Sequence, residues 1–376
     1  MIRRILLCCW ICVAFHAVAC TAETTDPDAA QRRAILKEGR FAELDHAMTA
    51  VQQAYEHGSI SDERLVEAFR AFYFADPDLE PKFDQWVAQF PRSYAALLAR
   101  GMYYEALGWV RRGSAYARST SDRQFAGMRA YHSMALRDLS KSTGLTAKPT
   151  VSYMQEIEIW KGLTGTNKES RELLDESVKR DPGNIVVRRT YLVSIQTRWG
   201  GSPKQMAAFV DECRRFPLPA TTLREFDAMV IADKAWVMYR DKDDPGAEKA
   251  YAQALALMPN DPDMLTQMSD VLIHEHKYEQ AVAPLSKLIG MNPNNSYALS
   301  KRGAIYQGMK QSERAVKDYE KAAELGDDFS ENELGKFYWF GISVPRDKER
   351  AIKLFRRAAE QGNKDAEKNL AWALQG

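Results

Sequence analysis

His274 and His276 are the most closely spaced histidines in this sequence, so they are the first candidates for metal chemistry. A helix presents two histidines to one zinc ion when they stand four residues apart, as in the HExxH pattern. Residues two positions apart on a helix instead point about 200° away from each other. We therefore predict no metal site here and place this pair at an exposed helix end.

Cys213 is the only cysteine that lies well beyond the N-terminal segment, and it is followed by Arg214 and Arg215. A neighbouring arginine favours the reactive thiolate. No histidine stands near it in the sequence, however, and no GxSxG motif or glycine-rich phosphate loop occurs. We predict that the protein is not an enzyme and holds no cofactor.

Arginine and aromatic residues alternate from Arg100 onward, and these types dominate the energetics of protein interfaces. The alternative, which we favour, is a helix with a basic solvated face and a buried aromatic face. Trp199 lies in a Gly-Gly loop that is either a binding loop or, as we favour, a helix end followed by a new helix at Ser202-Pro203. The candidate partner-binding residues are Arg100, Tyr104, Trp109, Arg111, Arg112 and Trp199.

These residues must be positioned by helices, because the C-terminal half repeats with a helical pattern. Three positions recur with spacings of 34, 34 and 36 residues, and within each repeat they lie at i, i+4 and i+7, which is one helix face. Small alanines allow a neighbouring helix to approach, and the larger residue fills the space between the two helices. The recurring sets are Ala247, Tyr251 and Ala254; Ala281, Leu285 and Leu288; Ala315, Tyr319 and Ala322; and Ala351, Phe355 and Ala358.

These repeats resemble two known families. Residues 228–329 resemble tetratricopeptide repeats. Residues 330–376 resemble a Sel1-like repeat followed by a capping helix. The Sel1 resemblance departs from the usual pattern at Ser343, where glycine is common, and at Arg350, where lysine is common. The matching positions are Leu334-Gly335, Tyr338, Gly341, Val344, Asp347, Ala351, Phe355, Ala358-Ala359 and Gly362. The resemblance implies an all-α fold, a right-handed alpha-alpha superhelix.

The upstream half, residues 40–227, is also predicted to be helical, and it carries a degenerate form of the same repeat. Ser170, Leu174 and Ser177 precede Pro182 at the offsets seen in the later repeats. The half resembles an uncharacterised bacterial domain that often precedes such repeats, through Arg100-Gly101-x-Tyr103-Tyr104 and residues 198–202. That resemblance implies a helical fold and no known activity. No stretch alternates with period 2, so we predict essentially no sheet.

The N-terminus has the pattern of an export signal. Two arginines precede an apolar stretch that ends at Ala19, which predicts a signal peptide over residues 1–19 and a tether over 20–39. Ala17-Val18-Ala19-Cys20 resembles a bacterial lipobox, which implies lipidation of Cys20. The alternatives are ordinary cleavage that leaves Cys20 free or paired with Cys213, and cleavage after Ala22. We expect an exported protein in the periplasm of a Gram-negative bacterium, with an outer-membrane lipid anchor as one form.

Composition narrows the class of partner. The chain has 376 residues, 45% of them hydrophobic and 27% charged, with a formal net charge of +1. This composition is that of a globular protein, and the balanced charge gives no electrostatic basis for binding nucleic acid. A stack of helix pairs offers an extended concave groove for a peptide or helix. We predict a protein-protein interaction module, a scaffold or adaptor; the alternative is an immunity protein that neutralises a secreted toxin or lipase.

Overall fold

The computed structural model describes residues 28–113, 120–163 and 168–375, and within these ranges the ordered elements are helices without strands. The all-α prediction is therefore confirmed. The chain divides into two compact units, residues 1–226 and 227–376, and the division falls inside helix α12 (Ala220–Arg240). Cys20 and the predicted signal peptide lie outside the described residues. None of the described helices is both long enough and apolar enough to span a lipid bilayer.

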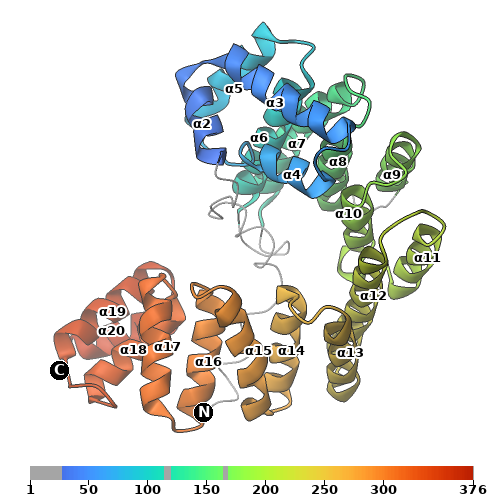
Figure 1. Cartoon of the computed structure of the whole chain (residues 1–376). Coiled ribbons are helices and arrows are strands. Elements are labelled where there is room, and N and C mark those ends of the chain that lie inside the picture. Colours follow the sequence, from blue (N-terminus) through green and yellow to red (C-terminus); the bar gives the residue numbers. More distant parts are fainter. Residues whose placement is uncertain (1–27, 114–119, 164–167, 376) are drawn as a thin grey trace. The chain divides into compact units, whose positions relative to one another are not determined.

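The N-terminal unit is built from helices of different lengths around the long helix α6 (Figure 1). Its elements are α2 (Ala29–Glu38), α3 (Phe41–Glu56), α4 (Asp62–Arg70), η2 (Pro77–Leu79), α5 (Glu80–Gln89), α6 (Tyr94–Arg112), α7 (Asp122–Ser142), α8 (Thr150–Leu163), α9 (Lys168–Arg180), α10 (Val186–Ser194), η4 (Thr197–Trp199) and α11 (Pro203–Cys213). Helix α6 is buried along most of its length, including its glycines Gly101 and Gly108. A Cβ atom on Gly101 would lie 2.8 Å from Leu139 of α7, so the glycine is what allows the two helices to pack so closely.

Helix α2 corrects the prediction that residues 20–39 form a tether. Ile35 and Leu36 on this helix are buried in the core of the unit, and Gly39 ends the helix with a φ of 75°. Two arginines tie α2 to the end of α4: Arg32 donates to the carbonyl of Ala68 (3.2 Å) and Arg33 to that of Ala71 (2.8 Å). The sequence shows only a short helix-compatible segment there, because the partners that bury it lie more than 30 residues away.

The C-terminal unit repeats a helix pair, and Figure 1 shows these helices following one another along the unit. After α12 come α13 (Asp244–Leu257), α14 (Pro262–His274), α15 (Tyr278–Met291), α16 (Ser296–Gly308), α17 (Ser312–Glu324), α18 (Asp328–Phe340), α19 (Lys348–Glu360) and α20 (Lys364–Ala373). We call α14, α16, α18 and α20 the first helices, and α15, α17 and α19 the second helices, of their repeats. All twelve recurring positions predicted from the sequence are buried, none more than 2% exposed.

The backbone repeats as well as the side chains. Each first helix begins at an Asp or Asn whose side chain accepts the N–H of the residue three positions later, which satisfies a free donor at the helix start. These N-cap residues are Asp261, Asn295, Asp327 and Asn363. Lys242, His276 and Lys310 are 34 residues apart, and each adopts a left-handed φ of 61–68° in the turn before α13, α15 or α17. His276 thus lies just beyond the end of α14, and His274, its last residue, has a 58% exposed side chain, as the sequence predicted.

In the C-terminal unit, two glycines of first helices face aromatic rings of second helices. A Cβ on Gly303 would lie 2.9 Å from the ring of Tyr319, and one on Gly335 would lie 2.6 Å from that of Phe355. Real Cβ atoms do not approach this closely, and the two rings are almost fully buried. Glycine is therefore required at these positions for distance rather than for backbone freedom.

We predict that Gly303→Ala lowers the free energy of unfolding of the C-terminal unit by about 1–3 kcal/mol, because the added methyl group displaces Tyr319. Gly308→Ala, five residues along the same helix, is the control, since nothing lies within 4 Å of its Cβ position. Alanine there should leave stability unchanged or raise it by up to about 1 kcal/mol, owing to its higher helix propensity. Urea denaturation followed by circular dichroism measures both. Equal effects of the two substitutions would contradict the packing argument.

Candidate protein-binding surface

The first helices of the C-terminal unit are joined to one another by a row of polar contacts. Between α14 and α16, the Tyr297 hydroxyl donates to both carboxylate oxygens of Asp270 (2.7 and 2.8 Å). Lys301 approaches the same carboxylate at 3.8 Å. The Asp270 side chain is only 3% exposed, and burial raises its pKa to about 7. The lysine and the hydroxyl therefore hold a carboxylate that water does not reach.

The row continues across α18 to α20. Gln307 of α16 donates to Glu333 of α18 (3.2 Å), and Asn369 of α20 donates to Asn332 of α18 (2.7 Å). Lys336 pairs with Glu333, and 35% of the lysine side chain is exposed, against 8% for the glutamate. We define the first-helix row as Asp270, Tyr297, Lys301, Gln307, Asn332, Glu333, Lys336 and Asn369. The acids of the row are nearly buried, whereas 18% of the Lys301 side chain and 35% of the Lys336 side chain are exposed, so the lysines are the charged groups that the row presents to solvent.

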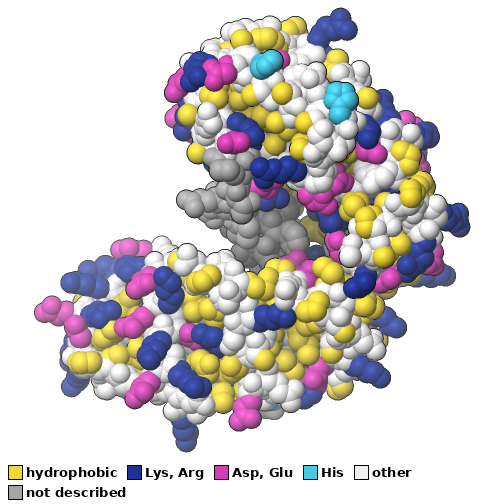
Figure 2. Space-filling view, in the orientation of Figure 1, with side chains coloured by type: hydrophobic (Ala, Val, Ile, Leu, Met, Phe, Trp, Pro, Cys, Tyr) yellow, Lys and Arg dark blue, Asp and Glu magenta, His cyan; other side chains and the backbone are white. Residues whose placement is uncertain are grey.

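Charges of both signs are interspersed over the face of the C-terminal unit seen in Figure 2, with hydrophobic side chains between them. No single-sign patch dominates that face, as the net charge of +1 leads one to expect. A pocket of about 550 Å³ opens beside the turn that precedes α19, lined by Tyr338 and residues 345–350. Arg350 covers the Tyr338 ring there at 4.1 Å. Among the described residues, no group of three or more His, Cys, Asp or Glu could hold a metal ion.

Arg100 and Tyr104, two of the candidate residues from the sequence, make their contacts inside the N-terminal unit. Arg100 donates to both carboxylate oxygens of Asp138 (2.6 and 2.8 Å) and to Asp84 (2.9 Å). Tyr104 is 4% exposed, and its hydroxyl donates to Asp84 (3.2 Å). Their contacts thus hold α5, α6 and α7 together. This matches the buried aromatic face that the sequence favoured, and a binding role for the two residues stays a prediction.

Trp109 and Trp199, 90 residues apart in the sequence, meet consecutive residues of α8. A Cβ on Gly162 would lie 3.0 Å from the Trp109 ring, and the Lys161 ammonium lies 5.1 Å from the centre of the Trp199 ring. Lys161 also pairs with Glu158 and is itself buried. Both tryptophans therefore serve packing in the N-terminal unit.

Arg111 and Arg112 are the two remaining candidate residues, and both lie over aromatic rings. The Arg112 guanidinium lies over Trp109 (5.7 Å) and Phe125 (5.9 Å), which ties the end of α6 to α7. Arg111 lies over Tyr131 (5.9 Å) and is exposed. Of the six candidates, Arg111 is the one most open to solvent.

The loop around Trp199 has the form that the sequence favoured. Gly200 ends η4 with a φ of 91°, and Ser202 caps α11, which has proline at its first position. Cys213, the last residue of α11, is a free and buried cysteine, and burial raises the pKa of its thiol to about 11. The thiol is therefore protonated at neutral pH.

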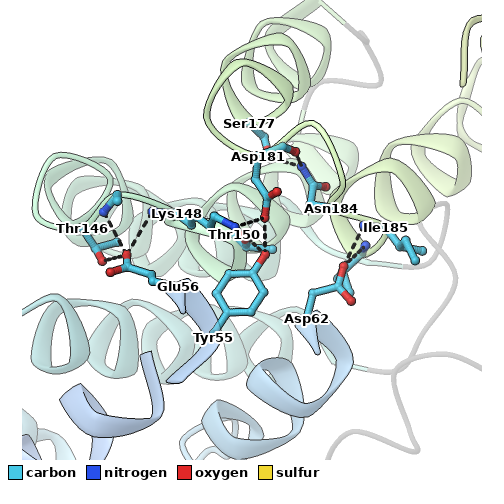
Figure 3. A network of polar contacts seen from close by, with 12 residues as sticks. Tyr55, Glu56, Asp62, Thr146, Lys148, Thr150, Ser177, Asp181, Asn184 and Ile185 are labelled. Carbon is cyan, nitrogen blue, oxygen red and sulfur yellow. Dashed lines mark hydrogen bonds and ion pairs between the residues drawn. The ribbon is translucent and has the colours of Figure 1, made fainter. Parts of the chain in front are cut away.

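A polar network that sequence reasoning missed joins the start of the N-terminal unit to its second half (Figure 3). The Tyr55 hydroxyl donates to Asp181 (2.7 Å) and shares a hydrogen bond with Thr150 (2.8 Å). Asp62 accepts the backbone N–H groups of Ile185 (2.7 Å) and Val186 (2.9 Å), at the beginning of α10.

Glu56 completes this network from the end of α3. It accepts the Thr146 hydroxyl, the N–H groups of Ala147 (2.9 Å) and Lys148 (3.1 Å), and the Gln52 amide (3.1 Å). Partial burial opposes its ionisation, but these donors prevail and lower its pKa. Tyr55, Glu56 and Asp62 all find their partners on segments far along the chain, so the network positions helices within the unit.

Comparison with known proteins agrees with these observations. Residues 28–165 match the model of a domain of unknown function, DUF4034, and residues 297–327 and 329–363 match the Sel1 repeat model. The sequence placed the first of these repeats among the tetratricopeptide repeats, because both families put small and bulky residues at the same positions. The chain is thus a helical-repeat protein in which Sel1 repeats follow a DUF4034 domain along the sequence. No curated protein matches it.

Several solved structures are similar to this chain at low sequence identity. Yeast Tom70 has a TM-score of 0.51 at 15% identity, with 83% of this chain and 61% of that one covered, so this chain spans less than two thirds of Tom70. A Sel1 repeat protein from Oxalobacter formigenes has a TM-score of 0.41 at 20% identity (58% and 88% covered). MamA from Desulfovibrio magneticus RS-1 has 0.35 at 19% (48% and 97%). The Tom70 likeness shows a helical-repeat fold.

Glu156 on α8 carries a buried carboxyl group. It is 5% exposed, and its Oε1 has no hydrogen-bond partner among the described residues. Burial raises its pKa from 4.5 to about 8. Between these pH values the folded protein keeps a proton that the unfolded chain loses. This group's contribution therefore makes stability fall as pH rises from about 4.5 to 8.

We predict that Glu156→Gln raises the free energy of unfolding at pH 8 by about 4 kcal/mol and has little effect at pH 4.5, since one pKa unit corresponds to about 1.4 kcal/mol. Urea denaturation at several pH values between 4.5 and 8 measures the difference. Glu43→Gln is the control, because Glu43 pairs with Arg40 at the surface. Parallel pH profiles for the wild type and Glu156→Gln would show that Glu156 is ionised in the folded state.

Proposed function

We propose that this protein binds another protein or peptide along the first-helix row of its C-terminal unit and acts as a scaffold or adaptor outside the cytoplasm. Proteins with Sel1 or tetratricopeptide repeats typically mediate protein-protein interactions and are typically not enzymes. The observation that carries the proposal is the row itself, in which Lys301 and Lys336, with side chains 18% and 35% exposed, pair with acids that are 3% and 8% exposed.

The rigidity of the row supports binding. Each first helix is tied to the next by a side-chain hydrogen bond, through Asp270, Glu333 and Asn332. A surface that is ordered before binding loses less conformational entropy when a partner docks. The Lys301 ammonium lies 5.3 Å from the centre of the Tyr297 ring and 3.8 Å from the Asp270 carboxyl group, and the Lys336 ammonium lies 2.5 Å from the carboxylate of Glu333. We infer a partner segment that presents hydrogen-bond acceptors.

We predict that the double variant Lys301→Met, Lys336→Met loses at least nine tenths of the partner recovered with tagged protein from the native envelope fraction. Lys317→Met is the matched control, because Lys317 is exposed on the second helix α17, away from the row. Quantitative mass spectrometry measures recovery, and circular dichroism verifies folding. Unchanged recovery with the double variant would exclude the row as the binding surface. A secreted hydrolase as the one stoichiometric partner would instead favour an immunity protein.

The proposed location rests on the sequence before residue 28. We predict that Cys20→Ser moves the protein from the membrane fraction to the periplasmic fraction of a Gram-negative host, because a lipid anchor requires the cysteine sulfur. Fractionation and the intact mass of the processed protein measure this. A wild-type protein that is already free of the membrane, with the mass of the unmodified chain, would show ordinary cleavage.

A further inference from the structure

Helix α20 stands at the first-helix position of a repeat. Its N-cap Asn363 follows Asp327 by 36 residues and accepts the N–H of Ala366 (2.9 Å), as Asp327 accepts that of Ser330 (2.7 Å). Ala366, like Ser330, is fully buried. Positions on α20 can therefore be compared with those on α14, α16 and α18 by counting from the N-cap.

Two of these positions contact the second helix of their own repeat. The residue eight places after the cap is small: Ser269, Gly303, Gly335 and Ala371. It is buried in α14, α16 and α18, and in the latter two it faces the aromatic ring of the second helix. The residue eleven places after the cap is Leu272, Tyr306, Tyr338 or Leu374. Leu272 is 2% and Tyr338 is 5% exposed.

On α20 the same face is open. Ala371 is exposed, and Leu374 is 61% exposed. Trp372 beside them is 50% exposed and packs on Phe340 (6.0 Å between ring centres), itself 59% exposed, which extends the apolar surface. A terminal repeat helix normally presents a polar outer side to water. We call Leu370, Ala371 and Leu374 the α20 face. Leu370 is partly buried against the cluster that contains Leu334 and Leu354, and no helix in the described part of the chain covers Ala371 or Leu374.

The preceding repeats show what fits such a face. The residue seven places after the cap contacts the residue that precedes the aromatic one in the second helix. In α16 this residue is Arg302, which makes a two-pronged ion pair with Asp318 of α17 (both bonds 2.8 Å). In α18 it is Leu334, which shares a hydrophobic cluster with Leu354 of α19. On α20 it is Leu370, so an apolar counterpart is required.

We propose that the α20 face docks an amphipathic helix of a partner protein, and that this helix has the same pattern of contact residues as α19. The pattern is an alanine, a leucine three residues later, a phenylalanine four residues later and a second alanine seven residues later. In α19 these residues are Ala351, Leu354, Phe355 and Ala358, all buried against the preceding helix pair. The docked helix continues the interface that each earlier repeat makes within itself. This surface is separate from the first-helix row, so either proposal can fail without the other.

The test titrates the full-length protein into a labelled peptide with the sequence of residues 348–360. Fluorescence anisotropy reports binding. The matched control peptide carries the change Leu354→Asp, which places a carboxylate against Leu370, as α17 would. We expect saturable binding of the first peptide and at least tenfold weaker binding of the second. No binding of the first peptide, or equal affinity for both, would overturn the proposal.

A protein variant locates the binding site. Ala371→Leu fills the space that the phenylalanine ring needs and should weaken binding at least tenfold. Lys368→Leu adds the same side chain on the same helix at an exposed position and should leave binding unchanged. Equal affinity of Ala371→Leu and wild type would show that the peptide binds elsewhere, for example in place of α19 itself. Sedimentation of the protein alone adds one more outcome: a dimer that Ala371→Leu dissociates would assign the face to a second copy and overturn the partner-helix proposal.

Discussion

The close approach of paired helices at small residues is the constraint on which both units depend. Gly303 and Gly335 let the rings of Tyr319 and Phe355 lie where a Cβ would otherwise be. Gly101 and Gly108 do the same for α7 against α6, where an added Cβ would come within 2.8 Å of Leu139 and 2.4 Å of His132. Contacts of this kind bury large side chains almost completely, and that burial is the main stabilising contribution in a fold without sheets or disulfides among its described residues.

Such packing leaves the polar groups to determine how neighbouring helix pairs are aligned. In the C-terminal unit, Asp270, Glu333 and Asn332 join consecutive first helices, because a buried carboxylate or amide must find partners. In the N-terminal unit, Asp62 and Glu56 bind backbone N–H groups of segments more than 80 residues away. These contacts are directional, so they specify one arrangement where apolar packing alone would tolerate several. The surface proposed for binding follows from that alignment.

The sequence predicted some local features and missed others for definite reasons. The helix end at Gly200 and the cap at Ser202 were predictable, because each depends on residues a few positions apart. The ion pair of Arg100 with Asp138 was not, because it joins two helices through residues 38 positions apart and leaves no periodic signal. Helix α2 was missed for the same reason: its burial against distant helices, rather than its composition, stabilises it.

The sequence by itself determined the all-α fold, the repeat length and the buried positions of the C-terminal unit, because a repeated helix contact imposes the same small and bulky residues every 34 to 36 positions. The tertiary structure alone decided which charged residues are internal. It placed Arg100 among acids, and it left Leu374 exposed although its counterpart Tyr338 is buried. Side-chain exposure depends on which helix packs alongside, and that neighbour is defined only when the helices are assembled in space.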